Sequence, residues 1–227
     1  MTLSIAGRCA RTDQFGVAIS SSSPAVAARC AWARAGVGAV CTQNITDPRL
    51  GTVLLDCMAG GESATEAMTE VTSTEPLIAW RQLTAVDRNG VTAAWSGEQT
   101  LGTYATAEGP SCVAAGNLLA DSHVPFEMVG AFAGRPDDDL GSRLVAALME
   151  GLRAGGEAGP VHSAGLIIVS DVPWPVTDLR VDWATNPVDE LAALWRLWRP
   201  QVDAYRLRAL DPSAAPSYGV PGDEEKG

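Results

Sequence analysis

The second residue of the chain combines two groups that could do chemistry together. Thr2 follows the initiator Met1 at the head of a predicted strand over residues 2–8. Methionine aminopeptidase removes Met1 when the next side chain is small, as that of threonine is. The exposed Thr2 would then carry a nucleophilic hydroxyl and an α-amine with a pKa of roughly 8, which can accept the hydroxyl proton near neutral pH. This order of residues predicts an N-terminal nucleophile that needs no distant histidine or aspartate.

Polar residues early in the chain are candidates to line a pocket around Thr2. Ser4 lies two residues along the same strand and faces the same side of it, although it could equally be a core hydroxyl. Ser21 and Ser22 follow a predicted strand over residues 15–20. They could form a polar pocket floor, or only a solvated turn.

Two further pairs follow predicted strands. Gln43 and Asn44 come after a buried strand, where they could point into the cleft or simply hydrogen-bond a loop. Gly116 and Asn117 end another strand. Backbone and asparagine N–H groups can stabilise an oxyanion, so this pair is a candidate oxyanion hole, although glycine and asparagine are also common in turns.

An arginine and a histidine add candidates for substrate binding. Arg34 could hold a substrate carboxylate through two parallel hydrogen bonds, or form a structural ion pair with a residue such as Asp87. His162 stands beside Ser163, where it could contact the substrate or only satisfy the hydrogen bonds of a loop.

Composition narrows the class of protein. The chain has 227 residues, of which 46% are hydrophobic, enough for the core of one large domain. A net charge of −11 disfavours nucleic acid and anionic membrane surfaces as partners, because both attract basic proteins. The sequence shows neither a long apolar run nor a signal-peptide pattern, so we expect a cytoplasmic protein with no membrane span. Five widely spaced cysteines fit buried thiols in a reducing cytosol and suggest no metal site.

Turn and capping signals divide the chain into elements. Asp47-Pro48 predicts the start of a helix that ends at Gly60-Gly61, and Ser63 with Glu66 forms a capping box for the next helix. Asn89-Gly90 is a hairpin signal. The predicted strands cover residues 2–8, 15–20, 37–43, 80–86, 91–95, 111–115, 163–170 and 178–183. Further helices are predicted over residues 125–132 and 140–153 and after Asn186-Pro187.

The order of these elements predicts the fold class. Helices come in pairs between groups of antiparallel strands, unlike the strict alternation of a Rossmann fold. We therefore expect an α+β fold, a four-layer αββα sandwich of two antiparallel sheets with helices outside. One domain is expected over residues 1–210, followed by a flexible acidic tail over residues 211–227. Leucine and tryptophan stripes in the last helix favour a homo-oligomer.

Short motifs spread from residue 1 to about residue 195 resemble a bacterial family catalogued as domain of unknown function 1028. No single motif is specific, but their order and spacing are. The matching segments are Met1-Thr2-Leu3-Ser4-Ile5, Gly16-Val17-Ala18, Ser21, Ala25-Val26, Trp32 to Gly38, Thr42-Gln43, Arg81-Gln82-Leu83, Val86-Asp87, Gly116-Asn117, Gly155-Gly156, Ser163-Ala164, Asp178 to Asp182 and Pro187-Val188-Asp189-Glu190-Leu191.

The resemblance implies an Ntn-hydrolase-like fold, because the family is placed in the superfamily of N-terminal nucleophile hydrolases. It implies an amidohydrolase that cleaves an amide or related C–N bond of a small molecule and needs no cofactor or metal. Thr2 would be the nucleophile and Asn117 part of the oxyanion hole. The candidate substrate-binding residues are Ser4, Ser21, Ser22, Arg34, Gln43, Asn44, Gly116 and His162.

Two positions depart from the pattern expected of the family. Ser22 stands where a basic residue is expected, and in related enzymes such a lysine lowers the proton affinity of the amine. The loop over residues 157–162 lacks the expected arginines, which favours a less anionic substrate. Two alternatives therefore stay open: a non-catalytic small-molecule binding or assembly protein on the same fold, and a cysteine-dependent hydrolase that pairs a thiol such as Cys9 or Cys41 with His162.

Overall fold

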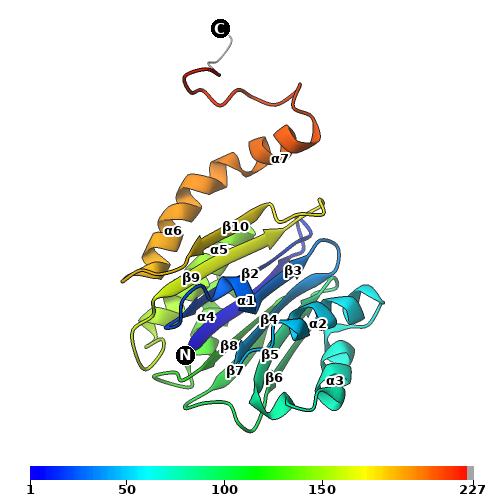
Figure 1. The fold of residues 1–227 in the computed structure, drawn as a ribbon, viewed down its shortest axis with the longest axis vertical. Helices are drawn as coiled ribbons and strands as arrows, with labels where there is room; N and C mark the ends of the chain where they lie inside the picture. Colours follow the sequence, from blue (N-terminus) through cyan, green and yellow to red (C-terminus); the bar gives the residue numbers. More distant parts are fainter. Residues whose placement is uncertain (224–227) are drawn as a thin grey trace.

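The computed structural model describes residues 1–223 and arranges them in four layers (Figure 1). Two antiparallel sheets pack face to face, and helices cover their outer faces. The larger sheet has the strand order β10-β9-β2-β1-β8-β7, and the smaller sheet has the order β3-β4-β5-β6. The predicted α+β sandwich of two antiparallel sheets is therefore confirmed.

The elements have the following bounds. The strands are β1 (Thr2–Cys9), β2 (Gln14–Ser21), β3 (Ala31–Arg34), β4 (Gly38–Asn44), β5 (Arg81–Asp87), β6 (Thr92–Ser96), β7 (Ala105–Gly109), β8 (Cys112–Asn117), β9 (Ser163–Val169) and β10 (Thr177–Val181). The α-helices are α1 (Ala27–Cys30), α2 (Arg49–Ala59), α3 (Ala64–Thr74), α4 (Val124–Ala133), α5 (Leu140–Arg153), α6 (Pro187–Trp198) and α7 (Val202–Leu210).

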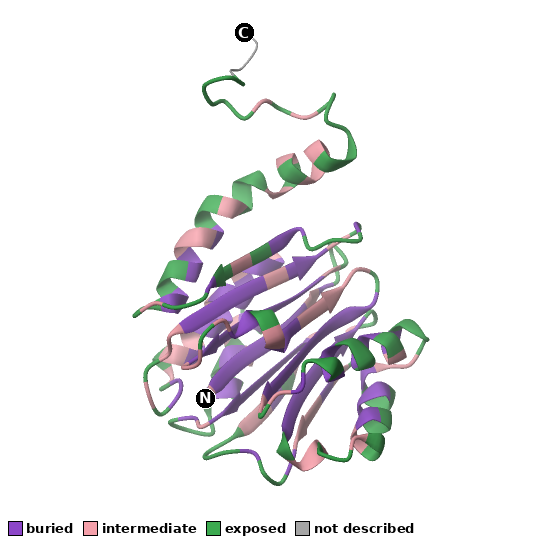
Figure 2. Ribbon diagram, in the orientation of Figure 1, coloured by how far each residue is buried: buried purple, intermediate pink, exposed green. Residues whose placement is uncertain are grey.

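The alternation of side chains along β1 shows how the layers are held together. Leu3 and Ile5 join the apolar core between the larger sheet and helices α4, α5 and α6, whereas Ala6 belongs to the core between the two sheets. A third core lies between the smaller sheet and helices α2 and α3. Because successive residues of a strand point to opposite faces, a central strand buried on both sides is apolar in both directions. Figure 2 shows this burial along the central strands of both sheets.

The predicted capping signals are present in part: Asn186 precedes α6, but its side chain makes no capping hydrogen bond. The capping box of Ser63 and Glu66 opens α3, and α5 covers the predicted residues 140–153. Helix α2, however, begins one residue later than predicted, at Arg49. Asp47 still caps it, because its carboxylate accepts a hydrogen bond from the Arg49 backbone N–H at 3.0 Å.

Four short or exposed elements were not predicted: α1, β3, β7 and α7. Helix α7 shows the reason. It has no buried residue, so its sequence lacks the apolar stripe from which a helix is predicted. In Figure 1 it extends away from the sheets, and its last residue coincides with the predicted domain end at residue 210. The predicted tail over residues 211–227 lies partly outside the described residues, which end at 223.

The helices of the structure can be compared with the expectation that no segment spans a membrane. Within residues 1–223, no helix combines the length and the apolar character needed to cross a bilayer.

A buried carboxylate joins the β5–β6 hairpin to the second helix of the outer layer. Asp87 is 2% exposed and accepts hydrogen bonds from the backbone N–H groups of Asn89 at 2.8 Å and Val91 at 3.0 Å, which shape the predicted hairpin turn. Its other oxygen accepts from the N–H of Ala64 at the start of α3, at 3.0 Å. One side chain therefore satisfies three backbone donors on two elements.

Replacing this carboxylate should destabilise the fold. We expect Asp87→Ala to lower the free energy of unfolding by about 2–4 kcal/mol, because three backbone N–H groups, one of them on the buried Ala64, lose their carboxylate acceptor. Urea denaturation followed by circular dichroism measures this. The exposed Glu98 offers a matched control, and Glu98→Ala should change stability by less than about 0.5 kcal/mol. Equal effects of the two substitutions would show that Asp87 does not organise the hairpin.

Candidate functional site

A row of polar side chains crosses one end of the larger sheet. Ser163, Ser21, Thr2 and Asn117 are direct cross-strand partners on β9, β2, β1 and β8. All four are buried, with Thr2 the most exposed at 6%. Side-chain alternation puts this row on the face that meets the smaller sheet, where residues such as Val17 continue as an apolar core. The space between the sheets is therefore polar at one end and apolar beyond it.

The smaller sheet carries a matching polar row. Gln43, Gln82 and Ser96 are cross-strand partners on β4, β5 and β6. The two sheets are joined through this row: Ser4 Oγ donates to Gln43 Oε1 at 2.7 Å, and Asn117 Nδ2 donates to Gln82 Oε1 at 3.1 Å. Gln43 Nε2 also donates to Gln82 Oε1, at 2.7 Å. The paired glutamines thus link Ser4 and Asn117 across the sandwich.

Gln82 uses every hydrogen-bonding position of its amide. Besides the two bonds that its oxygen accepts, its Nε2 donates to Ser96 Oγ at 3.0 Å and to the Gly116 carbonyl at 3.1 Å. A Cβ at position 116 would lie 2.5 Å from Leu119 Cδ2, so a larger residue there would have to displace the Leu119 side chain. Asn117 keeps a second N–H on Nδ2 beyond the one given to Gln82, and this is the donor an oxyanion hole needs.

The Thr2 hydroxyl lies among other hydroxyls. Thr2 Oγ1 donates to the Met1 carbonyl at 2.7 Å and lies 3.5 Å from Ser21 Oγ, which also donates to the Met1 carbonyl. With Met1 in place the Thr2 nitrogen is part of an amide and cannot act as a base. Removal of Met1 would free that amine within reach of the same hydroxyl.

Arg29 is linked to the site through hydroxyl groups, in a way that the sequence did not reveal. Arg29 Nη2 donates to Ser23 Oγ at 2.6 Å, and Ser23 Oγ lies 2.9 Å from Ser21 Oγ, the neighbour of Thr2. Ser22 itself is half-buried. Arg29, seven residues after Ser22 on α1, is thus the cation linked to Ser21 through Ser23. No spacing signal marks Arg29, since it depends on how β2 bends into α1.

Three predicted substrate-binding residues have side chains that are held by other contacts in the structure. Arg34 forms an ion pair with Asp56 at 2.8 Å rather than with Asp87. It lies beside Gly38, at the opposite end of β4 from Gln43 and roughly 16 Å along the strand. Asn44 is held by loops, because its Nδ2 donates to the Trp80 carbonyl at 2.7 Å.

The third of these residues, His162, is near the site only through its backbone. Its N–H donates to the Ser21 carbonyl at 2.8 Å. The ring instead stacks on Trp183 with centroids 4.4 Å apart, and Nδ1 lies 3.2 Å from the Ala184 carbonyl. Its orientation is therefore set by these contacts.

The thiols offer little support for a cysteine nucleophile. Burial raises the pKa of Cys30 and of Cys112 to about 11, and burial also raises that of Cys41, so these thiols are protonated at neutral pH. Cys9 lies at the far end of β1, roughly 23 Å along the strand from the end that contacts His162 through Ser21.

One group of possible metal ligands lies in the outer layer. Cys57, Glu62 and Glu70 bring a thiol and two carboxylates within 4.8 Å of one another at the turn between α2 and α3. All three are at least partly exposed. They belong to the helical layer outside the smaller sheet and not to the polar rows around Thr2.

Glu157, near the Met1 amino terminus, is a second residue that sequence reasoning missed. It is only 6% exposed, and among the described residues neither carboxylate oxygen has a hydrogen-bond partner. Burial raises the pKa of Glu157 to about 8, although the positive charge of the amino terminus and the Ser22 backbone N–H both oppose this shift. The loop was notable in sequence for missing arginines, but no pattern showed that its glutamate would be buried.

The raised pKa of Glu157 predicts a pH-dependent stability. Its protonated form stabilises the folded chain fully below about pH 4.5, and this contribution is lost as the pH rises through about 8. We therefore expect Glu157→Gln to become more stable relative to the parent protein between pH 5 and pH 9, by on the order of 3 kcal/mol. Urea titrations at both pH values measure this change. Glu98→Gln, on the surface, should show no such trend, and a pH-independent difference for Glu157→Gln would contradict the prediction.

Comparisons with known proteins found a family model and similar solved structures. A family model described as a family of unknown function, DUF1028, matches residues 2–191. A solved structure of a DUF1028 protein from Silicibacter pomeroyi is 28% identical with a TM-score of 0.80, covering 86% of this chain and 85% of that one. The ancestral β-subunit Anbu from Yersinia bercovieri also matches, at 11% identity and a TM-score of 0.38, over 89% of this chain and 97% of that one.

A search of the curated proteins found no match. The family model covers most of the chain, and the Silicibacter pomeroyi structure has the same fold over the same region. The chain therefore belongs to the DUF1028 family.

Proposed function

We propose that this protein is a hydrolase that cleaves an amide or related C–N bond of a small molecule, with Thr2 as its nucleophile after Met1 has been removed. The observation that carries the proposal is the polar row across β9, β2, β1 and β8, which surrounds the Thr2 hydroxyl with Ser21 and Asn117. A buried polar row in an otherwise apolar sandwich is costly unless each group is paired, so it supports a role beyond packing.

The proposed reaction uses groups of Thr2 itself and of its cross-strand partner Asn117. Thr2 Oγ1 attacks the substrate carbonyl carbon while the Thr2 α-amine accepts the hydroxyl proton. The free N–H of Asn117 and a backbone N–H stabilise the oxyanion. The amine then gives the proton to the leaving nitrogen, and water cleaves the resulting ester to regenerate Thr2. Arg29, acting through Ser23 and Ser21, favours the neutral amine because a nearby positive charge lowers the pKa of an ammonium group.

The proposal predicts a specific response to changes at position 2. We expect Thr2→Ala to lower kcat/KM on a panel of small amides by at least roughly a thousandfold, because it removes the nucleophile. Thr2→Ser keeps both the hydroxyl and the amine and should retain measurable activity. Thr65→Ala, an exposed threonine in α3, is the matched control and should behave as the parent protein does.

The N-terminal state is measured first by intact mass on protein made without an N-terminal tag. Loss of one methionine is the expected result. Quantitative retention of Met1, or full activity of Thr2→Ala, would exclude Thr2 as the nucleophile and favour a non-catalytic small-molecule binding protein on the same fold.

Assembly and location belong to the same proposal. Leu197 on α6 is 67% exposed and Trp183 is 61% exposed, and such apolar side chains support association between copies of the chain. We propose a cytoplasmic homo-oligomer. Analytical ultracentrifugation of the parent protein and of Leu197→Glu tests whether this surface is used.

A further inference from the structure

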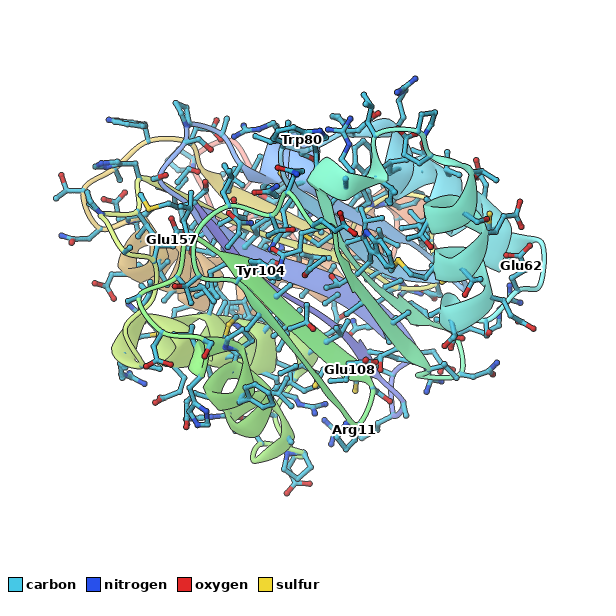
Figure 3. All side chains as sticks on the ribbon, turned by 90° about the horizontal axis from the view of Figure 1, so that it is seen from below. Arg11, Glu62, Trp80, Tyr104, Glu108 and Glu157 are labelled. Atoms are coloured by element: carbon cyan, nitrogen blue, oxygen red, sulfur yellow. The ribbon has the colours of Figure 1, made fainter. Side chains whose placement is uncertain are left out.

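The loop between α5 and β9 places a carboxylate beside the start of the chain. Gly155 and Gly156 have φ values of 122° and 61°, which non-glycine residues rarely adopt, and they let the loop turn inward. The loop is then anchored by Ala158, whose N–H donates to the Leu118 carbonyl at 2.9 Å. Glu157 lies between these two points. Figure 3 shows Glu157 toward one end of the strands, with Glu108 and Arg11 toward the other end.

Met1 shows what kind of group this end of the molecule accommodates. Its carbonyl accepts hydrogen bonds from Thr2 Oγ1 and Ser21 Oγ. Its side chain lies over the loop, because a Cβ on Gly159 would come within 2.9 Å of Met1 Cε. Its amino terminus exerts a favourable Coulomb interaction on Glu157 without forming a hydrogen bond to it. The aminoacyl group of Met1 therefore lies near two hydroxyl groups, a glycine and a carboxylate.

We propose that the space held by Met1 becomes the acyl-group subsite of the mature protein, and that Glu157 there binds a primary ammonium group α to the scissile carbonyl. The substrate class is then an α-amino acid amide or a short peptide with a free amino terminus. This inference rests on the proposed hydrolase function for its catalytic outcome, whereas its binding outcome is independent of that function.

The physical basis is the unsatisfied carboxylate. A carboxylate buried without a partner is unfavourable, so it is either protonated or paired with a cation. The described residues provide no arginine or lysine hydrogen-bonded to Glu157. A ligand ammonium supplies the missing charge, whereas a ligand without an amine leaves the carboxyl group unsatisfied. The preference for a ligand with an amine should be large, because a ligand without one leaves the buried carboxyl group unpaired.

A pair of matched ligands tests the proposal. L-methioninamide contains the acyl group of Met1, and 4-(methylthio)butanamide is the same molecule without the α-amine. Binding of both is measured by calorimetry to Thr2→Ala with Met1 removed, which cannot turn them over by the proposed route. We expect methioninamide to bind at least roughly tenfold more tightly, and Glu157→Gln in the same background to abolish that preference.

Turnover by the Thr2 protein gives a second readout. Hydrolysis consumes water and releases ammonia, and the expected kcat/KM for methioninamide exceeds that for 4-(methylthio)butanamide by at least roughly tenfold. Glu157→Gln should remove this difference, because neither amide then meets a carboxylate at the subsite. An equal loss on both amides would overturn the proposal and assign Glu157 to the Thr2 amine instead.

The readouts separate the two proposals. Selective binding without hydrolysis would support the ammonium subsite and refute the proposed hydrolase. Equal binding of both ligands would refute the subsite whatever the activity. The ligand comparison in the Thr2→Ala background with Glu157 intact does not depend on whether Glu157→Gln folds. Folding is expected in any case, because glutamine has the shape of the protonated carboxyl group that burial favours.

Discussion

The paired amides of Gln43 and Gln82 are the interaction on which the polar end of this sandwich depends. They lie between two sheets whose shared interior is otherwise apolar, and they are at most 1% exposed. A buried amide without partners costs several kcal/mol, whereas a complete network fixes both sheets in one register. Because Gln82 fills all of its hydrogen-bonding positions, it holds Asn117 and the Gly116 backbone in place beside Thr2.

The pairing of β1 with a strand on each side also explains how the start of the chain can be rigid. The first residues of most domains fray unless they are tied into a sheet. Here β1 lies between β2 and β8, so Thr2 has a strand partner on both sides. A nucleophile at a free end would need such support, because catalysis requires its hydroxyl and amine to hold one geometry.

Two charged residues from different segments of the chain lie near the start of β1. Arg29 is linked to Ser21 at the end of β2 through Ser23, whereas Glu157 comes from the loop between α5 and β9. A cation near the Thr2 amine lowers its pKa, and an unpaired carboxylate nearby attracts a substrate cation. In the proposed mechanism, Arg29 would tune the nucleophile and Glu157 would select the ligand. The strongly acidic composition of the chain does not reveal either role, since both depend on single residues.

The sequence by itself determined the elements that carry strong local signals, such as the Ser63–Glu66 capping box and helix 140–153, and it placed Thr2 at the head of a strand. From the order of these elements it also indicated the two-sheet fold. Only the tertiary structure decided which polar residues meet. It joined Gln82 to Asn117, and it sent Arg34 to Asp56. It also buried the Glu157 carboxylate with no side-chain partner among residues 1–223. The physical reason is that capping and periodicity act within a few residues, whereas these contacts depend on sheet register and on loop paths between segments far apart in the chain.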